Sequence, residues 1–193
     1  MKTIDTIYTR IDYEKKSKFI TILIPIRRIE EVTMNLEHYK VTYPKANHYC
    51  YAYIVNQDKG MSDDKEPAKT AGAPLLNILE KEQLTNILVI VIRYFGGIKL
   101  GTGGLIRAYS HGIQELLKTC PLQTLIPGLL VTIRFPFSLE KKVIYLLHNS
   151  KIISKQYKTD CLYTVEISEE LFDRIQSIVT VQSIQKILIE KTD

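Results

Sequence analysis

Six consecutive aliphatic residues, 87–92, form the strongest hydrophobic signal in the chain. The run is rich in β-branched residues and ends in a glycine-dense segment, which is typical of a strand buried on both faces. It is too short to cross a membrane. After the glycines, apolar residues recur at helical spacing from Leu105 to Leu117. The pattern therefore predicts a strand, a glycine loop, and a helix that opens directly out of Gly103 and Gly104.

The remaining hydrophobic pattern divides the chain into two parts. Pro and Gly residues between Cys120 and Gly128 indicate a boundary, so we expect domains over residues 1–124 and 128–193. The first part is predicted to contain strands over 4–11, 18–24 and 47–55, a charged turn over 12–17, and helices over 28–39 and 70–81.

The second part is predicted to contain strands over 129–135, 151–157, 161–167 and 183–189, with helices over 139–149 and 169–180. Its β-α-β-β-α-β order indicates a ferredoxin-like domain, in which two helices cover one sheet face and leave the other for a partner. The chain as a whole is therefore expected to be α+β.

The glycine segment is the predicted working surface. Glycine permits positive φ angles and close approach of the backbone, and a helix N-terminus offers free amides to an anion. Lys and Arg side chains would supply positive charge, and Tyr94 or Phe95 an aromatic contact. The predicted binding residues are Arg93, Tyr94, Phe95, Gly96, Gly97, Lys99, Gly101, Gly103, Gly104 and Arg107. The alternative is structural: a tight turn, with Arg93 paired to a carboxylate of the preceding acidic segment.

That acidic segment is a second candidate site. Its residues of interest are Asp63, Asp64, Glu66, Thr70 and Gly72. The carboxylates could bind a divalent cation or a basic partner, but the spacing lacks the ligand set of a calcium loop, which favours a solvated acidic turn. Thr70 could cap the helix that follows. We therefore predict no metal site.

Motifs for catalysis are incomplete. Gly96 and Gly101 have the first spacing of a P-loop, but Thr102-Gly103 stands where Lys and Ser or Thr are required. The dinucleotide fingerprint also lacks its third glycine. We assign no catalytic residue and no cofactor.

Two histidines remain as candidates. His48 and Cys50 would share one side of a strand, yet a packed histidine and a buried cysteine are commoner than a reactive pair. His111 lies within helical reach of the glycine segment and could contact a bound anion. Three tyrosines at alternate positions, Tyr49, Tyr51 and Tyr53, could stack on bases, but packing beneath a helix is favoured.

Composition and charge narrow the class of protein. The 193 residues are 45% hydrophobic with a net charge of +5, and most of that excess lies before Leu122. This is compatible with weak RNA or ribosome contact rather than a dedicated nucleic-acid binder. Three widely separated cysteines argue against a disulfide framework and a zinc site. The charged N-terminus lacks a targeting signal, so a cytoplasmic protein without membrane contact is expected.

Three blocks of residues, over 46–53, 63–72 and 93–110, resemble in order the signature blocks of the IMPACT family, specifically its bacterial YigZ-type members. In the second block Lys65, Ala68 and Lys69 replace the Gly, Ser and Gly that are usual in the family. These replacements remove two flexible backbone positions and a hydroxyl. They weaken the inference that the acidic segment contacts a ligand through its backbone.

The resemblance implies a fold and a class of function. The first domain would share the α/β fold of the second domain of a small-subunit ribosomal protein, also found in small-molecule kinases, and the second would resemble a domain of elongation factor G. Eukaryotic members act on translational control through protein contacts. We thus expect a non-enzymatic regulator linked to translation that binds RNA, the ribosome or a translation-associated protein. The alternative is an enzyme or sensor acting on a small phosphate-containing ligand at the same loop.

Overall fold

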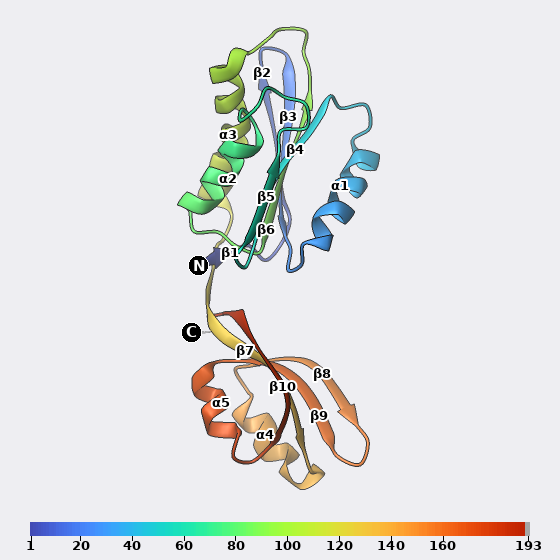
Figure 1. Ribbon diagram of the computed structural model, residues 1–193, viewed down its shortest axis with the longest axis vertical. Coiled ribbons are helices and arrows are strands. Elements are labelled where there is room, and N and C mark those ends of the chain that lie inside the picture. The colour runs from blue at the N-terminus through green and yellow to red at the C-terminus, as the bar shows by residue number, and fades with distance from the viewer. Residues whose placement is uncertain (192–193) are drawn as a thin grey trace. The chain divides into compact units, whose positions relative to one another are not determined.

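The computed structural model describes residues 1–191 and divides the chain into two compact units, Met1–Gln123 and a second unit that begins at Thr124 (Figure 1). Within the described residues, five α-helices accompany antiparallel sheets. The predicted α+β class is confirmed.

The N-terminal unit contains a five-stranded antiparallel sheet in the order β2-β3-β6-β4-β5. Its strands are β2 (Tyr8–Glu14), β3 (Ser17–Pro25), β4 (His48–Val55), β5 (Asp58–Ser62) and β6 (Ile87–Tyr94). A two-residue strand, β1 (Lys2–Thr3), precedes them and forms a bridge from Lys2 to Leu84. The aliphatic run of the sequence therefore becomes the central strand.

Helices cover both faces of this sheet. Helix α1 (Glu30–Thr42) lies on one face, and α2 (Gly72–Lys81) and α3 (Gly101–Thr119) lie on the other (Figure 1). Alternate β6 side chains enter the two cores: Val89 and Val91 pack beneath α2 and α3, whereas Ile90 and Ile92 pack on the α1 side. Each of these side chains is fully buried, as expected for a strand covered on both faces.

The tyrosine ladder of β4 is packed rather than free. Tyr49, Tyr51 and Tyr53 are half-buried against the core on the α1 side, where the rings of Tyr51 and Tyr53 stack 6.5 Å apart. The Tyr49 hydroxyl donates to the Tyr43 carbonyl at 2.7 Å. The packed arrangement, which the sequence favoured over stacking on bases, is confirmed.

The second unit has the predicted β-α-β-β-α-β order. Its elements are β7 (Gln123–Phe135), α4 (Glu140–Leu146), β8 (Lys151–Tyr157), β9 (Cys161–Ile167), α5 (Glu169–Ile175) and β10 (Thr180–Glu190), with a short 3-10 turn, Phe137–Leu139, before α4. The strands pair in the order β10-β7-β9-β8, all antiparallel. Val143 of α4 and Ile175 of α5 enter one core with the sheet, so both helices cover the same face.

Several predicted boundaries were wrong. Strand β2 extends to Glu14, so the predicted turn over 12–17 shrinks to Lys15 and Lys16. Strand β7 begins at Gln123 rather than at 129, because Pro127 and Gly128 pair in register with β10. Strand β10 begins at Thr180, and both predicted helices of this unit are shorter than expected.

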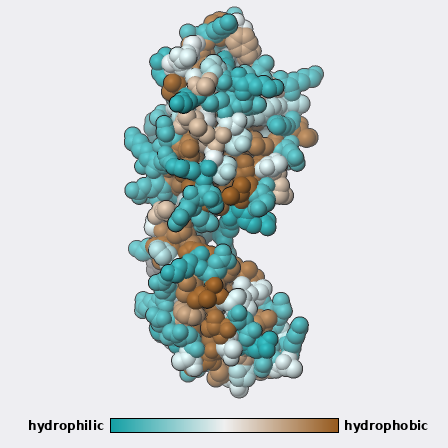
Figure 2. Space-filling model, in the orientation of Figure 1, coloured by the Kyte–Doolittle hydropathy of each residue, from teal (hydrophilic) through white to brown (hydrophobic). Residues whose placement is uncertain are grey.

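The surface of the N-terminal unit is rich in polar side chains on the face shown in Figure 2. The face shown in Figure 2 is mostly hydrophilic over the N-terminal unit, with hydrophobic residues scattered among polar ones. No helix within residues 1–191 has both the length and the apolar character needed to cross a membrane.

Candidate functional site

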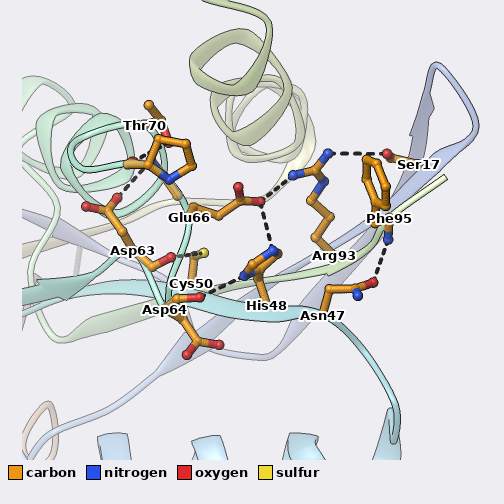
Figure 3. Close-up of polar contacts among 12 residues, drawn as sticks. Ser17, Asn47, His48, Cys50, Asp63, Asp64, Glu66, Thr70, Arg93 and Phe95 are labelled. Carbon is orange, nitrogen blue, oxygen red and sulfur yellow. Dashed lines mark hydrogen bonds and ion pairs between the residues drawn. The ribbon is translucent and has the colours of Figure 1, made fainter. Parts of the chain in front are cut away.

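A buried ion pair joins the acidic loop (residues 63–71) to the strand that leads into the glycine loop (residues 95–104). Arg93 Nη1 donates to Glu66 Oε1 at 2.5 Å, and the two side chains are 5% and 4% exposed (Figure 3). The Tyr109 hydroxyl of α3 donates to the same oxygen at 2.8 Å. The sequence left open whether Arg93 contacts a partner or pairs with a carboxylate of the acidic loop. The structure contains the pair, and its carboxylate is Glu66.

The rest of the Arg93 guanidinium is also enclosed. It stacks against the rings of Phe19 and Phe95, at 5.4 and 5.5 Å from the ring centroids, and Nη2 lies 3.4 Å from Ser17 Oγ. The expectation that Arg93 offers its charge to a partner is therefore corrected, because its charge is neutralised internally.

The carboxylates of the acidic loop also face inward. Asp63 accepts backbone N–H groups from Lys69, Ala71 and Gly72 at 2.8–2.9 Å. It therefore satisfies the N-terminus of α2, a role that the sequence suggested for Thr70. The Thr70 hydroxyl instead donates to the Pro67 carbonyl at 2.6 Å, so its predicted capping role is wrong.

Asp64 is bound to the neighbouring strand. Its Oδ2 accepts the Tyr49 amide at 2.6 Å. Within residues 1–191, no group of three or more His, Cys, Asp and Glu side chains could hold a metal ion. The carboxylates thus shape the loop through hydrogen bonds to the backbone.

Lysines occupy left-handed positions in this loop. Lys65 and Lys69 have φ angles of 69° and 63°, at the two positions where the resemblance noted in the sequence implies glycine. A residue with a Cβ adopts this conformation at a cost of about 1 kcal/mol. The loop therefore has backbone angles that suit glycine despite the substitutions.

His48 and Cys50 each bond to the acidic loop backbone. His48 Nδ1 lies 2.8 Å from the Asp64 carbonyl oxygen, which can only accept, so this nitrogen carries the proton. The other ring nitrogen lies 3.7 Å from Glu66 Oε1. The Cys50 thiol donates to the Asp63 carbonyl at 3.0 Å.

The Cys50 thiol is unsuited to nucleophilic chemistry. Burial raises its pKa to about 12, and the Tyr109 hydroxyl, 3.4 Å from the sulfur, opposes this shift more weakly. Because the thiolate is the reactive form of cysteine, a thiol with this pKa stays protonated and inert at neutral pH. The arrangement links the strand to the loop rather than activating a nucleophile.

This burial predicts a pH dependence of stability. The folded pKa of Cys50 lies above the ordinary cysteine value of 9.0, so its stabilising contribution is present below pH 9 and is lost as the pH rises towards 12. We expect the free energy of unfolding of the N-terminal unit to fall by up to about 1.4 kcal/mol per pH unit above 9 from this thiol. Urea unfolding between about pH 8 and about pH 11 measures the slope. The same slope in Cys50→Ala would contradict the assignment.

The glycines of the glycine loop have different roles. A Cβ on Gly96 would lie 2.1 Å from the Lys16 carbonyl carbon, so this glycine is required for close packing. Gly97 and Gly101 have left-handed φ angles of 85° and 72°. A Cβ on Gly103 would meet only Arg107 Nη1, at 3.6 Å. Packing within the protein therefore does not account for Gly103.

The exposed cations of the predicted set gather at this loop. Lys99 is exposed just before α3, and Arg107 leans over the first turn of that helix. Within the described part of the chain, neither side chain forms an ion pair or a side-chain hydrogen bond. Helix α3 also begins at Gly101 without a side-chain cap. The loop thus presents free positive charge beside backbone amides.

The aromatic and histidine predictions are resolved in part. Phe95 is 44% exposed, while Tyr94 packs on the α1 side and donates through its hydroxyl to the Pro44 carbonyl at 3.1 Å. Phe95 is therefore the aromatic side chain available to a partner. His111 Nε2 lies 3.7 Å from Asp12 Oδ1. It therefore faces a carboxylate, which disfavours the predicted contact with a bound anion.

Sequence reasoning missed residues that hold the loop in place. Ser17 Oγ accepts the Gly96 amide at 3.1 Å, and Asn47 Oδ1 accepts the Phe95 amide at 2.7 Å. These isolated polar residues carry no local signal of a distant partner.

Comparison with known proteins gives consistent matches over this chain. Residues 15–117 match the family described as the Impact N-terminal domain. An "IMPACT family member" from Haemophilus influenzae is 33% identical over 91% of this chain and 89% of its own length. The "IMPACT family member YigZ" from Escherichia coli is 34% identical, over 82% and 81%. A solved structure titled as a hypothetical protein is 31% identical, covers 99% of this chain and 98% of its own, and has a TM-score of 0.69.

Proposed function

Because this chain belongs to the IMPACT family, we propose that it is a regulator linked to translation that binds RNA, including ribosomal RNA, through its glycine loop. The family resemblance supports the link to translation. The observation that carries the RNA contact is the free positive charge of Lys99 and Arg107 beside the uncapped N-terminus of α3.

The geometry of the loop suits phosphate oxygens. The first turn of α3 offers backbone amides and the positive end of the helix dipole, both of which favour anions. Arg107 lies over that turn, and Gly103 leaves it open to close approach. Phe95 offers a half-exposed ring on which a base could stack. Together these groups match the charge and the flat bases of RNA.

The first test is co-sedimentation of the full chain with bacterial ribosomes across a salt titration. We expect Lys99→Ala with Arg107→Ala to weaken binding and to reduce the log–log salt slope by about 1.4 to 1.8, the value for two lost phosphate contacts. The control Lys141→Ala with Lys142→Ala removes the same charge from α4 and should leave binding unchanged.

The outcomes separate the alternatives. Salt-dependent binding that is insensitive to the loop variant would place the contact elsewhere. Absence of binding at the lowest salt would reject the RNA contact and favour a translation-associated protein. Competition by inorganic phosphate alone would support a small phosphate-containing ligand at the loop.

A further inference from the structure

We infer that the Lys15–Lys16 turn of the β2–β3 hairpin is a second part of this binding surface and contacts the phosphates of single-stranded RNA lying in the groove between the hairpin and α3. The inference rests on the proposed function and extends it to residues remote in sequence. Three observations support it: the backbone of the turn, its position, and the charges lining the groove.

The turn has a conformation that lysine does not favour. Lys15 and Lys16 have φ angles of 43° and 67°, and they join strands that pair from Glu14 to Ser17. Two-residue hairpin turns with positive φ at both positions favour Asn-Gly or Asp-Gly. Lysine offers no local side-chain hydrogen bond to compensate. Unfavourable backbone of this kind is common where the side chains serve a function.

The side chains of the turn are available to a partner. Lys15 and Lys16 are exposed, and neither forms an ion pair or side-chain hydrogen bond among residues 1–191. Ion pairs or hydrogen bonds of these two side chains therefore do not offset the strain of the turn.

The turn lies directly against the glycine loop. The close approach of Gly96 to the Lys16 carbonyl leaves no room for a side chain, and the neighbouring Ser17 hydroxyl accepts the Gly96 amide. The lysines are thus held beside the loop that carries Lys99, although the two segments are far apart in sequence.

A groove of about 640 Å³ lies where the turn end of the hairpin meets the N-terminal half of α3. Its volume lies within the about 300–1,000 Å³ of typical small-ligand sites, which suits one or two nucleotides. Residues from both walls line it, among them Asp12, Glu14, Lys15, Arg107, Ser110 and His111. The groove therefore has room for one or two nucleotides of a single strand.

The charges in the groove favour an anion. Both oxygens of Asp12 accept Arg10 Nε at 2.9 Å, and His111 faces the same carboxylate, so this negative charge is compensated. Lys15 and Arg107 are unpaired, against the one unpaired carboxylate of Glu14 among these lining residues. The balance is positive and complements a phosphate backbone.

The test replaces the turn with the sequence that its backbone prefers, Lys15→Asn with Lys16→Gly. We expect the urea midpoint of the N-terminal unit to rise, because the strain is relieved. We expect binding to a labelled single-stranded oligouridine, followed by fluorescence anisotropy with the full chain, to weaken. Its salt slope should fall by about 0.7 for the contact of Lys15, which lines the groove, and by about 1.4 where Lys16 also contacts a phosphate. A purely structural turn would change stability alone.

Lys65→Gly with Lys69→Gly is the matched control. It removes the same charge from two left-handed lysines in the acidic loop, outside the groove. It should raise stability and leave RNA binding unchanged. A further variant, Glu14→Gln, should strengthen binding by removing the unpaired carboxylate.

The outcomes distinguish this inference from the proposed function. If the turn variant binds RNA as tightly as the control while the Lys99 and Arg107 variant does not, the hairpin is excluded and the glycine loop stands. If the unmodified chain binds no RNA, both proposals are overturned. Equal affinity for a duplex of the same length would reject the single-stranded mode.

Discussion

Replacing Arg93 with methionine is expected to lower the free energy of unfolding of the N-terminal unit by about 3–5 kcal/mol. The change leaves the Glu66 carboxylate 4% exposed without its cation, and the Tyr109 hydroxyl alone cannot compensate a buried charge. Urea unfolding measures the loss. Hydrogen exchange of the buried β6 amides assigns it to this unit rather than to the second.

The partner variant and the double variant test whether the pair acts as a unit. Glu66→Gln should also destabilise strongly, since it leaves the arginine buried without a counter-charge. The double variant should cost less than the sum of the single variants by about 0.5–3 kcal/mol. Additive losses would contradict the coupling.

An exposed ion pair serves as the matched control for this cycle. Lys59 Nζ and Glu80 Oε1 are also 2.5 Å apart, but their side chains are 56% and 40% exposed. Removing either should cost no more than about 1 kcal/mol, because solvent screens exposed pairs. The contrast isolates burial as the cause of the larger effect.

Hydrophobic periodicity predicted the strands and helices that are buried by packing against other parts of the protein. The β6 run and the apolar face of α3 are strong signals because burial selects their residues directly. Strand β5 (Asp58–Ser62) was missed because its sequence does not alternate between apolar and polar residues. It is an edge strand that forms by pairing with β4. Its existence depends on the partner strand rather than on its own residues.

The residues of the candidate site could be predicted from the sequence, but the contacts among their side chains could not. The glycine loop and the acidic loop stand out locally, and a pair between Arg93 and a carboxylate was one of the alternatives. Choosing Glu66 required the path of the acidic loop, in which Asp63 and Asp64 bind backbone amides instead. The turn before β3 was predicted, but its left-handed backbone at Lys15 and Lys16 was not, because lysine is not among the residues that favour such turns.

Gly96→Ala is expected to separate the hairpin from the glycine loop and to cost about 3 kcal/mol or more, the upper end for overpacking. The new Cβ would lie 2.1 Å from the Lys16 carbonyl carbon and 2.4 Å from the Ser17 nitrogen. These are backbone atoms that no rotamer change can move away. Urea unfolding measures the cost, and faster hydrogen exchange over β2 and β3 would locate it.

Gly103→Ala separates packing from partner contact at the same loop. Its Cβ meets only the flexible end of Arg107, and alanine in a helix is more stable than glycine by about 0.5–1 kcal/mol. A gain in stability with weaker RNA binding would indicate that a partner approaches this backbone.

If Gly96→Ala instead leaves stability and exchange unchanged, the hairpin does not rest on the glycine loop. The turn would then not be held beside the glycine loop, and the proposed RNA contact of Lys15 and Lys16 would be rejected.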